Sequence, residues 1–150
     1  MEYFARSQRD FVYKYVVLLS DTDRFKHMSF ANYLKLMFLA TDALFIQVQN
    51  QIFLSKYRLK LIASRMQFRK QTVAGDNTLI KVNSAHLTNN AFTLLYTYVI
   101  EGTGELVGLA KQTFQIIDLT VNKYVDGLPG SLAAVLGQIK VEEEHLLYKY

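Results

Sequence analysis

Residues 29–48, SFANYLKLMFLATDALFIQV, repeat apolar side chains with the period of an α-helix. One stripe of this segment is almost entirely apolar, and its members are Leu34, Met37, Phe38, Thr41, Leu44, Phe45 and Val48. Polar residues form a single narrow line, because Lys35, Asp42 and Gln49 recur every seven positions. A helix that is apolar over most of its circumference must be surrounded by other elements. We therefore expect a long helix enclosed by the rest of the chain.

The segments on either side of this helix have the composition or the alternation of β-strands. The predicted strands cover residues 11–19, 59–69, 78–87, 91–101 and 105–118, with a short edge piece at 121–125. In the second of them, Ile62, Met66 and Phe68 are expected on one face, and Arg65, Gln67 and Arg69 on the other. Gly108 predicts a bulge or a close backbone approach in the last long strand.

Short turns at residues 74–77, 88–90 and 102–104 join the later strands, so no helical crossover connects them. Residues 131–147 follow Pro129-Gly130 and predict a C-terminal helix. The expected fold class is therefore α+β, with a curved antiparallel sheet wrapped around one long helix.

Length and composition favour one soluble domain spanning residues 1–150. The chain has 150 residues, 51% of them hydrophobic, enough to bury a core without disulfides. It contains no cysteine and begins with no secretory signal, which is compatible with a cytoplasmic protein. Polar residues interrupt the longest apolar stretch, 33–54, so no membrane span is expected. The net charge of +4 favours anionic partners, but no nucleic-acid-binding motif accompanies it.

Charged residues gather where the long helix begins, in residues 20–28, SDTDRFKHM. Together with residues 29–34, SFANYL, this stretch resembles the signature of the 4-hydroxybenzoyl-CoA thioesterase family, which has the hotdog fold. Two further stretches are similar to the family: residues 68–76, which end in Gly75-Asp76, and residues 126–129, followed by Leu132. The resemblance covers residues 13–136. It implies an enzyme that hydrolyses acyl thioesters.

By this resemblance Asp23 is the catalytic carboxylate, as general base or nucleophile. The backbone N–H of Phe30 would stabilise the oxyanion at the start of the helix, and His27 would orient Asp23 or the thioester. Each residue also has a purely structural interpretation. In that interpretation Asp21 or Asp23 serves only the helix dipole, which is worth about 0.3 to 1 kcal/mol at a surface, and His27 only packs against the helix start. Asp42 is a spare acidic candidate.

Substrate contacts are expected from Lys26, Ser29, Tyr33, Arg65, Gln67 and Arg69. Lys26 departs from the family, which usually has glycine there. It either narrows the pantetheine passage, forces a different turn, contacts a phosphate or lies in solvent. Ser29 is equally an N-cap. The basic residues 65 and 69 either attract CoA phosphates or an acidic carrier protein, or form a solubilising strand face.

The resemblance implies a homodimer or homotetramer with active sites at the subunit interface. The substrate would be an acyl-CoA or an acyl-carrier-protein thioester, so CoA or phosphopantetheine enters with the substrate and no separate cofactor is expected. No metal site is expected, because His27, His86 and His145 lack ligand spacing. Two alternatives are an acyl-thioester-binding module without turnover and an enoyl-thioester hydratase or dehydratase.

Overall fold

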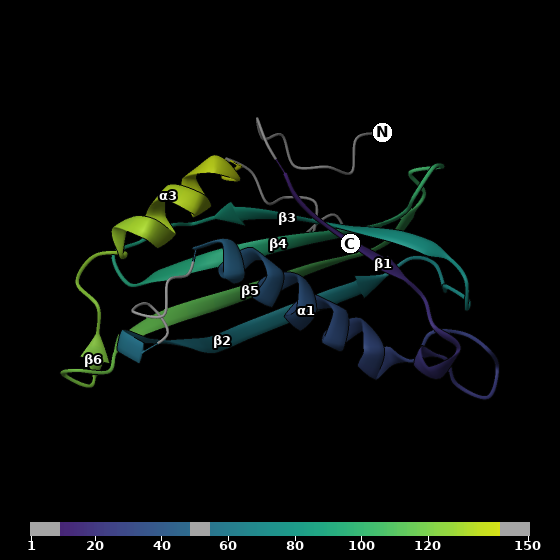
Figure 1. Cartoon of the computed structure of the whole chain (residues 1–150), viewed down its shortest axis with the longest axis horizontal. Helices are drawn as coiled ribbons and strands as arrows, with labels where there is room; N and C mark the ends of the chain where they lie inside the picture. The colour runs from purple at the N-terminus through teal and green to yellow at the C-terminus, as the bar shows by residue number, and fades with distance from the viewer. Residues whose placement is uncertain (1–9, 49–54, 142–150) are drawn as a thin grey trace.

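The computed structural model describes residues 10–48 and 55–141, except for the side chains of residues 30, 47 and 48. Its elements, in chain order, are β1 (Phe11–Val16), the 3-10 turn η1 (Leu19–Asp21), α1 (Phe30–Val48), β2 (Tyr57–Phe68), β3 (Asn77–Ala85), β4 (Ala91–Ile100), β5 (Leu106–Asp118), β6 (Lys123–Tyr124) and α3 (Gly130–Gln138). Figure 1 shows them along one elongated sheet.

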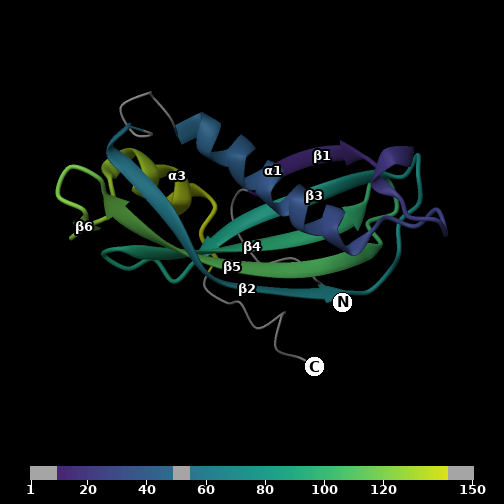
Figure 2. The same cartoon turned by 90° about the horizontal axis from the view of Figure 1, so that it is seen from below.

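The described strands form a single antiparallel sheet in the order β1-β3-β4-β5-β2, and β6 pairs with the far end of β5. The long helix α1 lies across one face of this curved sheet, with α3 beside it, as Figures 1 and 2 show. This arrangement confirms the predicted α+β class and the long helix packed against a curved antiparallel sheet.

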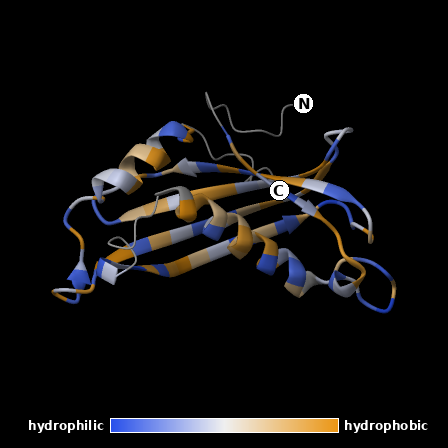
Figure 3. Cartoon of the chain, viewed as in Figure 1, coloured by the Kyte–Doolittle hydropathy of each residue, from blue (hydrophilic) through white to orange (hydrophobic). Residues whose placement is uncertain are grey.

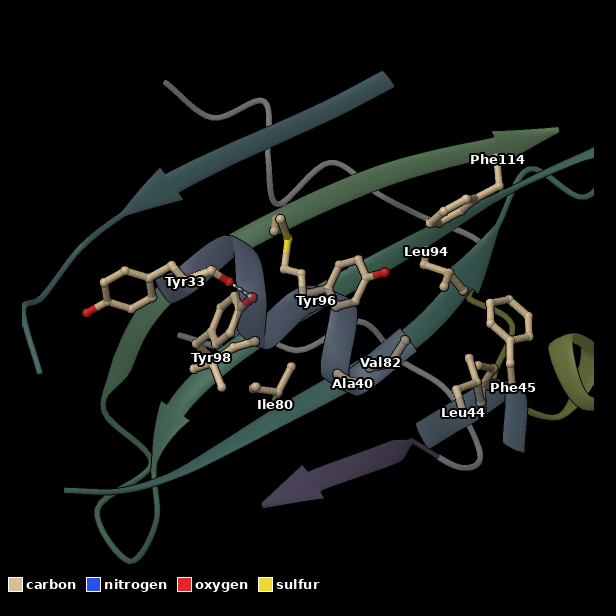
Figure 4. Close-up of a cluster of buried hydrophobic side chains, with 14 of the residues drawn as sticks. Tyr33, Ala40, Leu44, Phe45, Ile80, Val82, Leu94, Tyr96, Tyr98 and Phe114 are labelled. Atoms are coloured by element: carbon tan, nitrogen blue, oxygen red, sulfur yellow. Dashed lines mark hydrogen bonds between the residues drawn. The ribbon is translucent and has the colours of Figure 1, made fainter. Parts of the chain in front are cut away.

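The main core fills the space between α1 and the middle strands. Alternate side chains of β4 face the helix and are at most 2% exposed: Phe92, Leu94, Tyr96 and Tyr98. Figure 4 shows α1 lying over these strands with β2 to one side. Tyr98 donates its hydroxyl hydrogen to the backbone oxygen of Tyr33 at 3.2 Å. A smaller cluster on the opposite face contains Ala85, Leu95, Leu109 and Val141.

The C-terminal helix is shorter than predicted. α3 ends at Gln138, and the next residues pair with β3 instead of continuing the helix. The backbone N–H of Ser84 donates to Ile139, and Val141 donates back to Ser84. This edge of β3 is available because β1 pairs only as far as Val82. Sheet hydrogen bonds thus replace helical ones here, and residues 142–147 of the predicted helix lie outside the described residues.

Two predictions of which side chains are buried are wrong. The pairing of β2 with β5 shifts by one residue between Leu61 and Ala63, so Ile62 is a bulged residue that does not keep the face of Met66 and Phe68. Phe38, placed on the buried stripe of the helix, is 47% exposed. By contrast, the close approach predicted at Gly108 is confirmed, because a Cβ there would lie 2.9 Å from the backbone oxygen of Gln67.

No helix among the described residues has the length and apolar character needed to cross a membrane. Figure 3 shows that apolar and polar residues alternate along the strands.

Candidate active site

The charged stretch forms a narrow loop between η1 and α1. Thr22 pairs with Met28 as an antiparallel bridge, and the backbone N–H of Asp23 donates to the oxygen of His27 at 2.9 Å. A turn closes the tip, since the N–H of Lys26 donates to the oxygen of Asp23 at 2.9 Å. Residues 23–26 are exposed, and the loop is mostly hydrophilic in Figure 3. The sequence therefore presents Asp23 on a hydrogen-bonded loop beside the start of α1.

The two aspartates of this loop have opposite environments. Asp21 is 4% exposed, and its Oδ2 accepts hydrogen bonds from the Tyr15 hydroxyl at 2.7 Å and the Leu18 N–H at 2.8 Å. Asp23 is exposed, and its Oδ1 accepts from the N–H of Phe25 at 2.8 Å. Within the described ranges, no residue is hydrogen-bonded to its Oδ2. Of the two aspartates, Asp23 is therefore the one whose carboxylate is exposed.

The backbone of Asp21 ties the loop to the helix. Its carbonyl oxygen accepts from the N–H of Ser29 at 3.0 Å and from Nδ2 of Asn32 at 2.7 Å. Nδ2 of Asn32 also donates to Oγ of Ser29 at 2.9 Å. Ser29 directly precedes the first residue of α1, the predicted N-cap position, and its hydroxyl is held by the Asn32 amide. These bonds fix the helix start, and with it the backbone of Phe30, relative to Asp23.

Tyr15 is the phenol that Asp21 holds, and its pKa responds to this contact. The pKa of Tyr15 is raised from 10.0 to about 12. Partial burial is the largest cause, followed by the nearby Asp21 carboxylate. Burial also raises the pKa values of Tyr96 and Tyr98 well above the usual range.

Stability is expected to fall as the pH rises above about 10. Between the unfolded pKa of 10.0 and the folded value of about 12 for Tyr15, the unfolded chain has lost protons that the folded one keeps. The contribution of Tyr15 to stability is therefore fully present below pH 10.0, and it is lost as the pH rises through the pKa of Tyr15 in the folded state, about 12. Thermal melts across the alkaline range would measure it. In the Tyr15→Phe variant the melting temperature should fall less steeply with rising pH. A fall as steep as that of wild type would contradict the assignment of this effect to Tyr15.

Lys26 adopts the backbone conformation that the family's glycine would favour. Its φ is +63°, in the left-handed region, and the residue is exposed. Glycine adopts this conformation without strain, whereas other residues rarely do. A side chain with a Cβ in this conformation costs about 1 to 2 kcal/mol.

Lys26→Gly is accordingly expected to stabilise the protein by about 1 kcal/mol, after the entropy that glycine loses on folding is deducted. The melting temperature should rise by about 2 to 4 °C. Arg24→Gly is the matched control, because Arg24 lies in the same loop without a positive φ and should lose stability. If the melting temperature falls in Lys26→Gly as it does in Arg24→Gly, the backbone of Lys26 is not strained.

The loop after β2 packs against the same region. His27 and Val73 form an antiparallel bridge, and the N–H of Met28 donates to the oxygen of Thr72 at 2.9 Å. Tyr33 is 5% exposed, and its hydroxyl lies 3.0 Å from Oγ1 of Thr72. The ring of Tyr33 packs edge-on against Phe68 with centroids 5.0 Å apart. Tyr33 thus joins α1 to the end of β2, with its hydroxyl engaged inside the protein.

The remaining predicted substrate residues lie elsewhere. Arg65 stands opposite Lys111 in the ladder, and Gln67 stands opposite Leu109, which belongs to the cluster on the face away from α1. Arg69 follows β2, where its N–H donates to Val107 at 2.8 Å. The structure therefore brings Asp23, Lys26, His27, Ser29 and the start of α1 together, whereas Arg65 and Gln67 lie on the other side of the sheet.

Asp42, the spare acidic candidate, is exposed on α1, about three turns of helix from its start. Sequence reasoning missed Asp21, Asn32 and Thr72 as residues that hold the loop. The Asp21-x-Asp23 spacing was the one available signal, because it places two carboxylates in one short turn.

The family model described as the thioesterase-like superfamily matches residues 17–136. No curated protein matches the chain in sequence.

Several solved structures are similar. A 1,4-dihydroxy-2-naphthoyl-CoA thioesterase from Synechocystis is 20% identical, with a TM-score of 0.77 over 87% of this chain and 98% of that one. The dynemicin thioesterase is 16% identical, with a TM-score of 0.80 over 90% and 100%. A Staphylococcus aureus protein in complex with CoA is 16% identical, with a TM-score of 0.78 over 91% and 87%. The chain thus has the hotdog fold of these thioesterases and belongs to the thioesterase-like superfamily.

Proposed function

We propose that this protein hydrolyses an acyl thioester, with Asp23 as its catalytic carboxylate. The observation that carries the proposal is the contrast between the two aspartates. Asp21 is buried and engaged by Tyr15 and Leu18, whereas Asp23 is exposed beside the start of α1. Membership of the thioesterase-like superfamily supports the reaction class.

In the proposed reaction, Asp23 takes a proton from water as that water attacks the thioester carbonyl, or attacks the carbonyl itself. The carbonyl oxygen gains negative charge, which the first backbone N–H groups of α1, beginning with Phe30, are suited to stabilise. The carbon–sulfur bond then breaks, and the thiolate leaves and takes up the proton that Asp23 removed from water. If Asp23 attacks directly, the product of this step is an acyl–aspartyl anhydride, and water then hydrolyses it, which restores the carboxylate and supplies the proton of the thiol. His27 lies in the same loop and is proposed to orient Asp23 or the substrate.

The carrier of the acyl group is proposed to be CoA. The similar S. aureus protein was solved with CoA, and the similar Synechocystis enzyme acts on a CoA thioester. Arg24 and Lys26 are exposed at the loop tip and carry positive charge suited to CoA phosphates. The same charge suits an acidic acyl carrier protein, so both carriers belong in the test.

We further propose that two copies pair through β2, as a homodimer or as half of a homotetramer. Within the described sheet, β2 is an edge strand, and Leu61 and Ile62 on it are 39% and 46% exposed. Unprotected edges of this kind pair readily with another strand. Size-exclusion chromatography with light scattering measures the state, and a monomer at all concentrations would refute this pairing.

The test of the proposed function is thiol release from a panel of acyl-CoA and acyl-carrier-protein thioesters that differ in chain length and aromatic character. Turnover of at least one thioester is expected. Saturable binding without turnover would favour the alternative, a binding module, in which Lys26 at the usual glycine position has accompanied the loss of chemistry.

A further inference from the structure

Three exposed apolar side chains gather on the hairpin that joins β5 to β6. Leu119 is 44% exposed, Val121 60% and Tyr124 45%. The backbone N–H of Leu119 donates to the oxygen of Lys56 at 2.8 Å, so the hairpin is tied to the start of β2. Figures 1 and 2 show β6 and the start of β2 at one end of the sheet, away from the loop that carries Asp23. These apolar side chains therefore lie outside the candidate active site.

Basic side chains surround this hairpin. The start of β2 and β6 contribute four exposed cations: Lys56, Arg58, Lys60 and Lys123. Within the described ranges, no salt bridge joins any of them to a carboxylate. At the opposite end of the sheet, by contrast, the salt bridges Lys14–Glu101 and Lys70–Glu105 neutralise two lysines, at 3.4 and 2.6 Å. The cations around the hairpin are thus available to an external anion.

Two of these cations flank the tyrosine on the sheet face away from α1. Leu59 packs against the main core under α1, so its neighbours Arg58 and Lys60 point to the other face. Arg58 and Tyr124 both stand opposite Ile117 in the ladder. Nζ of Lys60 donates to the Tyr124 hydroxyl at 3.4 Å. Pairing of two copies through the backbone edge of β2 would leave this face uncovered.

The region keeps a net positive charge. Its carboxylates are Asp118, whose Oδ1 accepts hydrogen bonds from the N–H and the hydroxyl of Thr120 at 2.9 and 2.6 Å, and Asp126, which is exposed after β6. The four cations outnumber these two carboxylates. Exposed apolar side chains with a basic rim are what peripheral proteins present to an anionic lipid surface, where tyrosine lies at the level of the headgroups.

We infer that this hairpin patch, the three apolar side chains with the four surrounding cations, binds reversibly to an anionic lipid surface. Val121 enters the boundary between headgroups and acyl chains, and the cations contact lipid phosphates. A protruding hairpin enters a fluid lipid layer without a matching pocket, which favours lipid over an acidic protein. The inference does not depend on the proposed function, because it concerns the other end of the sheet and requires no turnover.

The test is co-sedimentation of the full chain with vesicles of phosphatidylcholine alone and of phosphatidylcholine and phosphatidylglycerol in equal parts. Wild type should bind the anionic vesicles at least about 100-fold more tightly, because each basic residue near such a surface adds about fivefold. Added salt should weaken this binding, since it screens exposed charges. Failure of wild type to bind the anionic vesicles would overturn the inference.

Arg58→Gln/Lys60→Gln removes two cations of the patch and should weaken binding to the anionic vesicles about 25-fold. Arg24→Gln/Lys26→Gln is the matched control, because it removes the same charge from the exposed loop at the other end. Its binding should stay near that of wild type. All four residues are exposed, so folding should persist, and thermal melts check it. Equal weakening in the two variants would show attraction by net charge alone and would contradict a site at the hairpin.

Val121→Ser tests the apolar part of the patch and should weaken binding about fivefold. Phe25→Ser is its control, since Phe25 is 64% exposed in the loop of Asp23. Loss of binding in Phe25→Ser, with none in Val121→Ser, would place the lipid contact at that loop and refute the inference. Binding of an acyl carrier protein without binding of vesicles, if Arg58→Gln/Lys60→Gln abolishes it, would assign the patch to an acidic protein instead.

Discussion

Replacing Asp23 by Asn is expected to lower kcat for thioester hydrolysis by about 10²- to 10⁴-fold, the usual contribution of a general base. The amide keeps the shape of the side chain and its Oδ1, which accepts the N–H of Phe25 at 2.8 Å. It removes the negative charge and the basic oxygen. Because Asp23 is exposed, the melting temperature should change little. Thiol release and a thermal melt on the same preparation measure both effects.

Asp42→Asn is the matched control, since Asp42 is an exposed aspartate on α1 and was the spare acidic candidate. Its activity should stay near that of wild type. Retention of full activity by Asp23→Asn would remove Asp23 from the mechanism. Loss of activity in Asp42→Asn, with full activity in Asp23→Asn, would identify Asp42 on α1 as the catalytic carboxylate.

Replacing Asp21 by Ala is expected to reduce stability by about 3 kcal/mol or more. The substitution deletes hydrogen bonds to a charged acceptor, each worth about 1.5 to 3 kcal/mol, and leaves the N–H of Leu18 and the hydroxyl of Tyr15 without this partner. For a chain of this length the melting temperature should fall by about 6 to 12 °C. Thermal and urea unfolding would measure the change.

Tyr15→Phe is the graded control, because it removes one of these bonds and keeps the carboxylate; a loss of about 1.5 to 3 kcal/mol is expected. Asp21→Ala with wild-type stability would contradict the role of Asp21 as the anchor of the loop. The two aspartate variants should therefore differ in which property they lose. Asp23→Asn loses activity and keeps stability, whereas Asp21→Ala loses stability first.

The sequence predicted the fold class because its signals are local. The 3.6-residue period placed the helix within one residue of α1, and the turns at 88–90 and 102–104 placed the hairpins that join β3 to β4 and β4 to β5. It also placed the charged loop at the helix start. Gly108 was correctly identified as a close approach, because only glycine leaves room for the Gln67 backbone.

The sequence failed where a contact between distant residues decides the outcome. A strict alternation assigns Ile62 to the face of Met66, but the bulge in the pairing with β5 breaks that alternation. The C-terminal helix ended early because an edge of β3 offered backbone hydrogen bonds at Ser84. Both errors come from partners that lie far away in the chain.

By itself, the sequence determined the long helix, the antiparallel class of the sheet and the loop that carries two aspartates, because side-chain period, turn residues and charge act over a few neighbouring positions. Only the tertiary structure decided which aspartate is buried and which is exposed. That choice depends on Tyr15 of β1 and Leu18 reaching Asp21, and on the bridge from His27 to the loop after β2. Burial and hydrogen bonding depend on how distant elements pack, and no local pattern encodes them.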